Sequence, residues 1–523
     1  MSDGGMGADL VIIDANVITM HSAKPQAQAI AVKGGKIVDV GATSAMKRWI
    51  DAQTRIINLK GKTVVPGLID THAHMITLGS PLPMIDLRGV HSIREIKRRL
   101  AAKVKETGRG RWIQGRGWDQ DRLKEKRYPT KWDLDRVSPE NPVMLKRVCG
   151  HIGVANSKAL KIAKIDADET ASLGNLVSRD PKTGEPTGIL LEGASDVLWD
   201  LPEPSEEDLR AACGRACAEA VKVGLTSVTW LVYKPNEVHA LKKLRRQGKL
   251  PLRINVMIPI EYFRSFRDKA LDDQFLRQRC VKIFTDGSLG ARTAALEKPY
   301  ADEPSTKGVL YYSQEELSKL ISEVDNAGYQ AALHAIGDLA LGQALEAFKT
   351  MLNRERIAKM RHRIEHASIL NPKLIRQIKK LGLIVCVQPH FVVSDFWVED
   401  RLGHERARWT YALKSMVESG ILIAASSDAP AEPLNPILGL WAAVARESFP
   451  EERLSVRETL EAYTINAAYF SFEEDVKGSI AVGKYADLTV LSHDPFKVEP
   501  ERIRDIRVEM TIVDGKVVYS ALD

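Results

Sequence analysis

The chain has 523 residues, 44% of them hydrophobic and 27% charged, which is the composition of an ordinary folded protein. A chain of this length is too long to fold around one small hydrophobic core, so we expect a large domain and a smaller one. The net charge of +7 comes from dispersed basic residues rather than a basic stripe, so we expect no nucleic-acid partner. We also expect a cytoplasmic protein without a membrane partner, because no apolar run approaches roughly 18 residues and the start of the chain lacks an export signal.

The cysteines are odd in number and lie in apolar segments: Cys149, Cys213, Cys217, Cys280 and Cys386. We interpret them as reduced thiols packed in a core, not as a disulfide framework. Cys213 and Cys217 lie four residues apart on a predicted helix, but the further ligands of a zinc site are lacking, so packing is the preferred interpretation.

Both ends of the chain carry short, half-apolar strands that flank turns. At the N-terminal end they are 9–13, 29–32 and 34–40, and at the C-terminal end they are 486–491 and 510–518. Strands of this kind bury their apolar faces by packing against a second sheet. The sequence therefore predicts a small β-sandwich domain built from residues 1–63 and 478–523.

Between the two ends, apolar strands alternate with amphipathic helices. The predicted strands are 64–71, 226–230, 252–258, 281–285, 330–334, 363–366, 383–388 and 422–426. The predicted helices include 205–222, 314–327, 340–351 and 372–381, with 456–468 after the last strand. Near-continuous apolar strands that alternate with helices are typical of a closed parallel barrel. We therefore predict an α/β fold, a (β/α)₈ TIM barrel over residues 64–477.

The stretch from about 75 to 204, between the first two barrel strands, is too long for one loop. It contains a strand-like piece at 142–145 and the tryptophans Trp112 and Trp118. We predict an insertion at the top of the barrel, where long insertions shape the binding cleft.

The first barrel strand leads into Asp70-Thr71-His72-Ala73-His74. Side chains alternate along an extended segment, so the imidazoles of His72 and His74 lie on one side and can reach one ion. A His-X-His pair alone is a weak signal. This pair follows a buried strand at the carboxyl end, where barrel enzymes place their chemistry, so we predict a metal site.

Three further polar residues end later barrel strands: His334, His366 and Asp428. Each has a structural alternative, because a histidine can be hydrogen-bonded in the core and an aspartate can cap the next helix. Since all three are expected at the rim that carries His72 and His74, we interpret them as metal ligands, and Asp428 also as the proton acceptor.

Lys282 lies on the apolar strand 281–285. A buried ammonium must be paired, deprotonated or chemically modified. One hypothesis is a carbamate, formed with carbon dioxide, that bridges two metal ions. The alternative is a structural ion pair with Asp286 or Glu192.

Together these groups predict a hydrolase. Two divalent ions, or one in a reduced site, would lower the pKa of a water molecule and polarise a carbonyl group. Asp428 would take the water proton and deliver it to the leaving nitrogen. Nitrogen and oxygen ligands suit zinc, with iron, manganese and nickel as alternatives.

The sequence resembles the amidohydrolase superfamily in the segment from Pro66 to His74 and in His334, His366 and Asp428, which occur in the family's order. It is similar in more detail to the amidohydrolase-3 branch of YtcJ-like and N-substituted formamide deformylase-like proteins. That likeness covers nearly the whole chain and rests on segments 150–151, 156–160, 186–192, 282–290, 334–338 and 363–367.

The resemblance implies hydrolysis of an amide-type carbon–nitrogen bond in a small molecule, a terminal β-sandwich and a homodimer. Some branches hold one metal without a lysine, so the number of ions and the role of Lys282 stay open. The implied metal residues are the histidines His72, His74, His334 and His366, a carbamylated Lys282 and Asp428, which would also be the general base.

Residues expected to shape the substrate pocket are Trp118, Asp119, His151, Arg292 and His390. For each, loop packing or a surface contact is the alternative. Arg292 is a candidate for binding a carboxylate or for an ion pair with a neighbouring loop, and Glu192 for a hydrogen bond near the metals or for bracing the insertion.

The leading hypothesis is an amidohydrolase acting on an acyclic amide or a formamide-like bond. A second hypothesis is a cyclic amidohydrolase or deaminase with the same metal site. A third is a barrel that serves as a non-catalytic scaffold or binding protein, which would be expected to lack ligands.

Overall fold

The computed structural model describes residues 7–79, 84–165, 174–199, 204–266 and 271–522. Its centre is an eight-stranded parallel sheet, and neighbouring strands follow the chain order. The strands are β8 (Leu68–Ala73), β15 (Leu225–Leu231), β16 (Arg253–Pro259), β17 (Leu276–Phe284), β18 (Gln330–Ala335), β19 (Arg363–His366), β20 (Ile384–Val387) and β21 (Ile423–Ala425).

The first and last strands of this sheet meet, which closes the barrel. Thr71 Oγ1 on β8 donates to the Ala425 carbonyl on β21 at 3.0 Å. Just beyond, the Asp428 amide donates to the His72 carbonyl at 2.9 Å. The predicted TIM barrel is confirmed, and its closure brings Asp428 beside His72.

Helices connect the barrel strands and pack around them. Ser205 caps α6 through a capping box, so this helix begins where its sequence signal predicts. The predicted helix 456–468 is divided at Thr464 into α18 and α19. The connecting helices are α6 (Glu206–Lys222), α7 (Pro235–Arg246), α8 (Ile260–Phe266), α9 (Gln314–Asn326), α10 (Asp338–Met351), α11 (Arg354–Met360), α12 (Pro372–Leu381), α13 (Phe391–Ser394), α14 (Val398–Leu402), α15 (His404–Ala407) and α16 (Leu413–Glu418). The helices α17 (Pro436–Ala445), α18 (Val456–Tyr463) and α19 (Ile465–Phe470) follow the last barrel strand.

The two ends of the chain form two further sheets. One has the order β5-β4-β1-β6 and the other β24-β23-β22-β7-β2-β3. Apolar side chains of both sheets share one buried cluster, so the sheets pack face to face as a sandwich. Their bounds are β1 (Leu10–Ile13), β2 (Asn16–Ile18), β3 (Gln26–Ala27), β4 (Ala29–Lys33), β5 (Lys36–Gly41), β6 (Arg55–Asn58), β7 (Thr63–Pro66), β22 (Leu488–Leu491), β23 (Val508–Val513) and β24 (Lys516–Ser520).

The predicted strand 64–71 is two strands that belong to different sheets. β7 pairs with β2 and β22 of the sandwich, whereas β8 pairs with β15 of the barrel. The change occurs at Gly67, where a Cβ atom would lie 2.1 Å from Thr226 Oγ1. A residue without a side chain is required there because the chain passes so close to β15.

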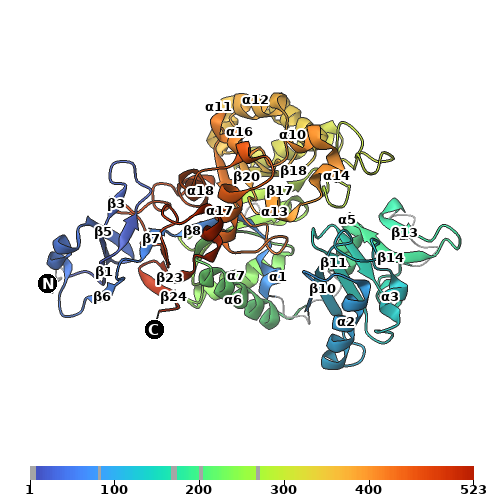
Figure 1. Ribbon diagram of the computed structural model, residues 1–523, viewed down its shortest axis with the longest axis horizontal. Helices are drawn as coiled ribbons and strands as arrows, with labels where there is room; N and C mark the ends of the chain where they lie inside the picture. The colour runs from blue at the N-terminus through green and yellow to red at the C-terminus, as the bar shows by residue number, and fades with distance from the viewer. Residues whose placement is uncertain (1–6, 80–83, 166–173, 200–203, 267–270, 523) are drawn as a thin grey trace.

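The long insertion after β8 forms its own sheet, in the order β13-β14-β12-β11-β10-β9. Figure 1 shows the insertion and the terminal sheets on opposite sides of the barrel. The predicted strand at 142–145 corresponds to β11. The insertion strands are β9 (Met84–Asp86), β10 (Ile113–Trp118), β11 (Val143–Arg147), β12 (Ile152–Ala155), β13 (Val177–Arg179) and β14 (Pro186–Leu191); its helices are α1 (Met75–Gly79), α2 (Ile93–Thr107), α3 (Lys131–Asp135), α4 (Ser157–Ile162) and α5 (Glu192–Trp199).

All five cysteines are free, and four are buried. Cys149 is the exception, because it is half-buried and lines a cavity over the barrel. Burial raises the pKa of the Cys213 thiol and raises that of Cys217 to about 12, as expected for packed thiols. None of the described helices is long and apolar enough to cross a membrane.

Candidate functional site

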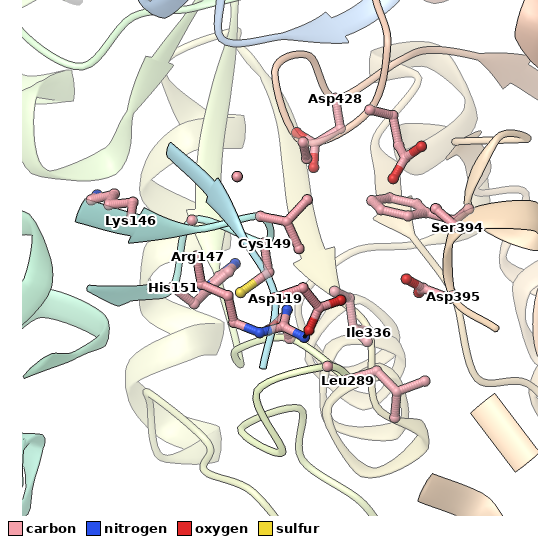
Figure 2. Close-up of a pocket in the computed structure, with 18 of the residues that line it drawn as sticks. Asp119, Lys146, Arg147, Cys149, His151, Leu289, Ile336, Ser394, Asp395 and Asp428 are labelled. Carbon is pink, nitrogen blue, oxygen red and sulfur yellow. Dashed lines mark hydrogen bonds and ion pairs between the residues drawn. The ribbon is translucent and has the colours of Figure 1, made fainter. Parts of the chain in front are cut away.

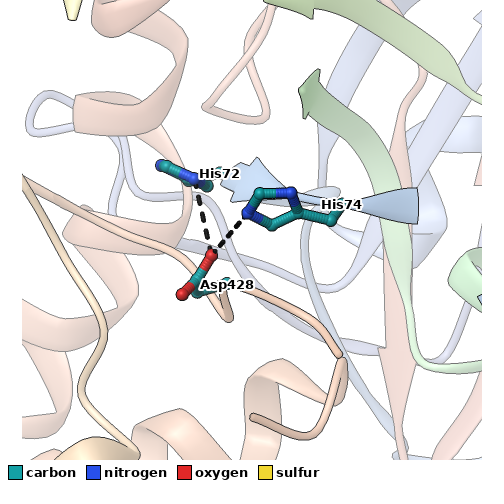
Figure 3. Close-up of side chains that lie close together, drawn as sticks. All are labelled: His72, His74 and Asp428. Carbon is teal, nitrogen blue, oxygen red and sulfur yellow. Dashed lines mark ion pairs between the residues drawn. The ribbon is translucent and has the colours of Figure 1, made fainter. Parts of the chain in front are cut away.

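His72 and His74 lie at the carboxyl end of β8 and face Asp428, as Figure 3 shows. Asp428 Oδ1 lies 3.1 Å from His74 Nε2 and 3.5 Å from His72 Nε2. The Asp428 backbone has a φ of 54°, in the left-handed region that non-glycine residues rarely adopt. This backbone turn directs the carboxylate from the end of β21 towards β8.

The three side chains fit a divalent metal ion. Their ligand atoms all lie within 4.8 Å of one another. Asp428 Oδ1 and His74 Nδ1 are buried and make no hydrogen bond within the described structure. A buried carboxylate oxygen that faces two imidazole nitrogens, without a hydrogen bond of its own, is suited to a shared cation.

His334 and His366 end β18 and β19 and reach the same rim. Their ring centroids are 4.5 Å apart, and the His366 centroid is 5.4 Å from that of His72. His366 has a φ of 74°, a second strained backbone position in the site. The structure therefore brings together all four predicted histidines.

Hydrogen bonds select which nitrogen of each ring carries the free lone pair. His334 Nε2 donates to the Gly287 carbonyl at 3.0 Å, which leaves Nδ1 as the acceptor, and Nδ1 is buried without a hydrogen-bond partner. His366 Nδ1 donates to Gln388 Oε1 at 2.8 Å, which leaves Nε2. Partners of this kind fix the tautomer of a metal-binding histidine.

Burial keeps these imidazoles neutral. It lowers the pKa of His72, His74 and His334, and it lowers that of His366 to about 4. Burial opposes ionisation of Asp428, but the neighbouring His74 and His72 outweigh it and lower the pKa of that carboxyl. Neutral imidazoles and an ionised carboxylate are the forms that bind metal ions.

Lys282 on β17 is fully buried, and its Nζ lies 3.3 Å from His72 Nε2. Burial lowers the pKa of this ammonium. Neither expected ion pair forms. Asp286 accepts backbone N–H bonds from Ala295, Ile336 and Gly337 at 2.8–3.0 Å, and Glu192 Oε2 lies 2.7 Å from His151 Nδ1. The ion-pair alternative for Lys282 is therefore wrong for both carboxylates, because each is committed to other partners.

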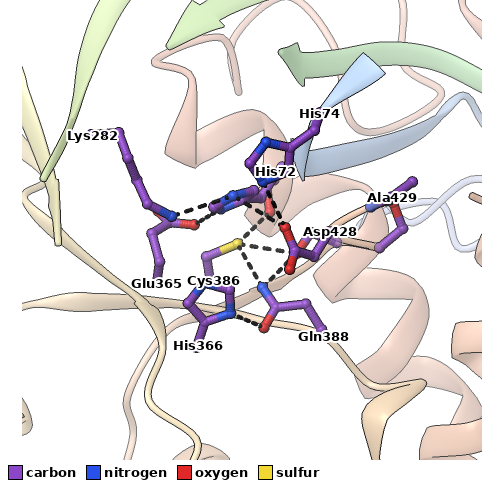
Figure 4. A network of polar contacts seen from close by, with 12 residues as sticks. His72, His74, Lys282, Glu365, His366, Cys386, Gln388, Asp428 and Ala429 are labelled. Carbon is purple, nitrogen blue, oxygen red and sulfur yellow. Dashed lines mark hydrogen bonds and ion pairs between the residues drawn. The ribbon is translucent and has the colours of Figure 1, made fainter. Parts of the chain in front are cut away.

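Glu365, which sequence reasoning did not single out, holds His72 in place (Figure 4). Its carboxylate accepts from His72 Nδ1 and also lies 2.5 Å from Arg363 Nε. Both Glu365 and Arg363 are fully buried. The available signal was two charged residues at alternate positions of the short strand β19, which places them on one face inside the barrel.

A second cluster of metal-binding residue types, His72, Glu365 and Cys386, is a poorer candidate. Burial raises the pKa of the Cys386 thiol well above its ordinary value, so the thiol stays protonated. Glu365 is already neutralised by Arg363, and neither Glu365 nor Cys386 lines the cavity described next.

The candidate metal residues lie at a cavity of about 320 Å³ between the barrel and the insertion. The barrel contributes His74, Lys282, His334, His366 and Asp428 to its wall. Figure 2 shows Lys146, Arg147, Cys149 and His151 of the insertion on one side, with Asp395 and Ser394 of the barrel loops on another. The cavity has the position and size of a small-molecule site.

Two of the five expected pocket residues line this cavity, namely Asp119 and His151. His151 is held by Glu192, which outweighs the effect of burial and raises the pKa of His151 to about 9. Trp118, Arg292 and His390 are not among the residues that line it.

Each of these three side chains has a structural partner instead. Trp118 is buried in the core of the insertion, and its Nε1 donates to the Leu145 carbonyl at 3.0 Å. Arg292 pairs with Asp302 at 2.8 Å. His390 is paired with Glu432, and it is Glu432 that lines the cavity.

The insertion also places side chains in the cavity that the sequence did not suggest. These include Arg116 at the end of β10 and Lys146 and Arg147 on β11. Charged residues within a half-apolar strand are visible in the sequence. The sequence does not show that the insertion sheet faces the barrel, and this orientation is what places those side chains in the cavity.

The chain was compared with known proteins. A family model described as "Amidohydrolase family" matches residues 55–519. YtcJ of Bacillus subtilis (strain 168) is 34% identical over 522 residues, which cover 96% of this chain and 98% of that protein. N-substituted formamide deformylase of Arthrobacter pascens is 28% identical over 539 residues and covers 98% of both chains.

A solved structure of an uncharacterized metal-dependent hydrolase from Pyrococcus furiosus is also similar. It superposes with a TM-score of 0.76 at 34% sequence identity. The match covers 93% of this chain and 100% of that one.

Proposed function

The chain belongs to the amidohydrolase family, and from this premise we propose that it hydrolyses a non-peptide carbon–nitrogen bond of the amide or N-substituted formamide type. The observation that carries the proposal is the convergence of His72, His74 and Asp428 on one point of the cavity. The similarity to N-substituted formamide deformylase supports the bond type. A small molecule is the substrate class that suits the size of the cavity.

We propose that His72, His74 and Asp428 hold one divalent ion, and that His334 and His366 hold a second. The nitrogen and oxygen donors suit zinc. A divalent ion, when bound, would lower the pKa of a water molecule and polarise the substrate carbonyl. Lys282, which is fully buried with its Nζ 3.3 Å from His72 Nε2, would supply an anionic ligand to both ions if its neutral amine combined with carbon dioxide and released one proton to form a carbamate.

The chain's own residues supply the proton transfer. The Asp428 carboxylate is ionised and faces the cavity, so it takes the proton from the attacking water and later gives it to the leaving nitrogen. Glu365 keeps His72 in one orientation while this happens. The insertion covers the rim and limits the access of other water molecules to the reacting bond.

Elemental analysis and a substrate screen test the proposal. We expect stoichiometric divalent metal in the wild type and turnover of at least one compound among N-formyl, N-acyl and cyclic amides. His72→Ala is expected to lose metal and activity, whereas His404→Ala, at a site where the side chain is 76% exposed, is expected to retain both. Full activity in His72→Ala, or a metal-free wild type, would refute the proposal and favour the scaffold hypothesis.

The screen also separates the open-chain reaction from the cyclic one. Turnover confined to cyclic amides or ring amines would favour a cyclic amidohydrolase or deaminase with the same metal residues. We further propose a cytoplasmic location. We also propose a homodimer, and analytical ultracentrifugation of the purified chain tests this oligomeric state.

A further inference from the structure

Arg116 occupies a special position in the cavity wall. It is the residue of β10 that is not buried, and its side chain lines the cavity. Gly150 lies opposite, where a Cβ atom would come within 3.2 Å of Arg116 Nη2. Glycine at this position therefore leaves room for the guanidinium group.

Three other cations of the insertion wall are paired with carboxylates. Arg147 Nη2 lies 2.7 Å from Asp119 Oδ1, and Lys146 Nζ lies 2.5 Å from Asp196 Oδ1. Arg88 pairs with Asp86 at 2.7 Å. Because their charges are already balanced by carboxylates, these three side chains attract an anionic ligand only weakly.

Arg116 has no such partner. Within the described part of the chain, its guanidinium makes one hydrogen bond, from Nη2 to the Val148 carbonyl at 3.1 Å, and no ion pair. Its Nε is buried without a hydrogen-bond acceptor. A buried donor without a partner is costly, so a bound acceptor at this point would be stabilised.

Arg122 also lines the cavity without an ion pair to a described residue, but its position differs. Its side chain is exposed, and the guanidinium lies over the Phe396 ring at 4.6 Å from the centroid. Arg122 is therefore a hydrated cation at the cavity edge, where its charge is screened by solvent.

Arg116 lines the same cavity as the candidate metal residues. Arg116 and His74 both line this cavity. Tyr233, which stacks on His74 with ring centroids 5.2 Å apart, lines it as well. One ligand in this cavity can therefore approach Arg116 and His74 together.

We propose that Arg116 binds a carboxylate of the substrate, so that the hydrolysed compound is an N-acylated or N-formylated amine that carries a carboxylate group. The planar guanidinium offers parallel donors that match the two oxygens of a carboxylate. The inference rests on the proposed function for the identity of the reacting bond. Binding of the carboxylate does not depend on turnover.

The test uses ligands that cannot be hydrolysed. Levulinate and its two next longer homologues carry a ketone in place of the amide and a carboxylate at the other end. Each is titrated calorimetrically into the metal-loaded wild type and compared with the uncharged hydroxy ketone of matching length. We expect at least one keto acid to bind about tenfold more tightly than its partner, which corresponds to ~1.4 kcal/mol.

Variants then assign that preference to a residue. Arg116→Ala and Arg116→Gln are expected to reduce the tenfold ratio to about threefold or less, and Arg116→Lys is expected to keep an intermediate ratio, because a point charge lacks the planar fork. Arg109→Ala removes one positive charge from the insertion outside the cavity, where Arg109 pairs with Glu140 at 3.0 Å. We expect it to bind like the wild type.

Several results would overturn the inference. One is equal affinity for the keto acid and the hydroxy ketone in every pair. Another is an affinity ratio in Arg116→Ala that equals the wild-type ratio. A third is loss of the ratio in Arg122→Ala or His72→Ala while Arg116→Ala retains it. Circular dichroism checks that each variant is folded. If no amide is hydrolysed but the ratio still depends on Arg116, the proposed function fails and the carboxylate site stands.

Discussion

Replacing Glu365 by glutamine tests whether a buried carboxylate organises the metal site. Glu365 lies between His72 Nδ1 and Arg363 Nε, and all three side chains are fully buried. The substitution keeps the shape of the side chain but removes its charge. The guanidinium of Arg363 is then left in the barrel interior without a counter-charge.

The structure sets the expected magnitudes. Removing one partner of a buried ion pair costs about 3–5 kcal/mol in the free energy of unfolding, because the other charge remains buried. Weakening the hydrogen bond that orients a metal-binding histidine lowers metal affinity by roughly 10- to 100-fold. We therefore expect Glu365→Gln to be strongly destabilised and to bind metal weakly.

Chemical denaturation and metal titration against a chelator measure the two effects separately. Glu346→Gln is the matched control, since Glu346 pairs with Lys349 at 3.0 Å, their side chains are 44% and 62% exposed, and the variant is expected to lose less than about 1 kcal/mol. The double variant Arg363→Met/Glu365→Leu removes both buried charges. It should recover much of the stability and still bind metal weakly, because His72 keeps no carboxylate.

Wild-type stability and wild-type metal affinity in Glu365→Gln would refute this reasoning. Recovery of metal affinity in the double variant would show that the buried charge, and not the hydrogen bond to His72, controls the site.

Three further predictions concern residues of the cavity. Asp428→Asn is expected to reduce turnover by roughly 10²- to 10⁴-fold while the fold and most of the metal are retained, as measured by kinetics and elemental analysis. Lys282→Ala is expected to lose one metal equivalent and to be partly rescued by short carboxylic acids in an activity assay. Asp395→Asn is expected to change the pH dependence of stability: burial raises the pKa of Asp395 to about 8, against a hydrogen bond from Tyr411. Between about pH 4 and pH 8 the folded wild type therefore holds a proton on Asp395 that the unfolded chain releases. Its free energy of unfolding falls as pH rises across that window, by at most ~1.4 kcal/mol per pH unit. The variant lacks the titrating carboxyl and loses this slope.

Contrary outcomes are equally specific. Persistent turnover in Asp428→Asn would mean that another group is the base. An intact two-metal site in Lys282→Ala would exclude the carbamate. Parallel stability curves for Asp395→Asn and the wild type, measured by denaturation from pH 4 to pH 8, would show that Asp395 titrates at its ordinary value.

Local patterns predicted the barrel and the clustering of the candidate metal residues because both depend on short-range periodicity. Buried parallel strands are continuous apolar runs, and their carboxyl ends meet at one rim. His72, His74, His334, His366 and Asp428 could therefore be grouped without coordinates. The same reasoning merged β7 and β8, because Gly67 joins two apolar strands whose sheets differ only in their distant pairing partners.

The substrate pocket was predicted less well, since it depends on contacts between segments far apart in the chain. Trp118 and Arg292 are of types common in binding sites, but their partners Leu145 and Asp302 make them structural. Arg116 carries no sequence signal that separates it from other arginines of the insertion. It becomes distinctive because no carboxylate among the described residues forms an ion pair with its guanidinium.

The sequence by itself therefore determined the barrel, the terminal sandwich and the residues that face the rim, because strand periodicity and strand ends encode them directly. Only the tertiary structure decided which partners those residues have: Glu365 for His72, no ion pair with any carboxylate of the described residues for Lys282, and the insertion as the second wall of the cavity. Pairing and charge compensation are properties of side chains brought together from distant segments, and no local pattern specifies them.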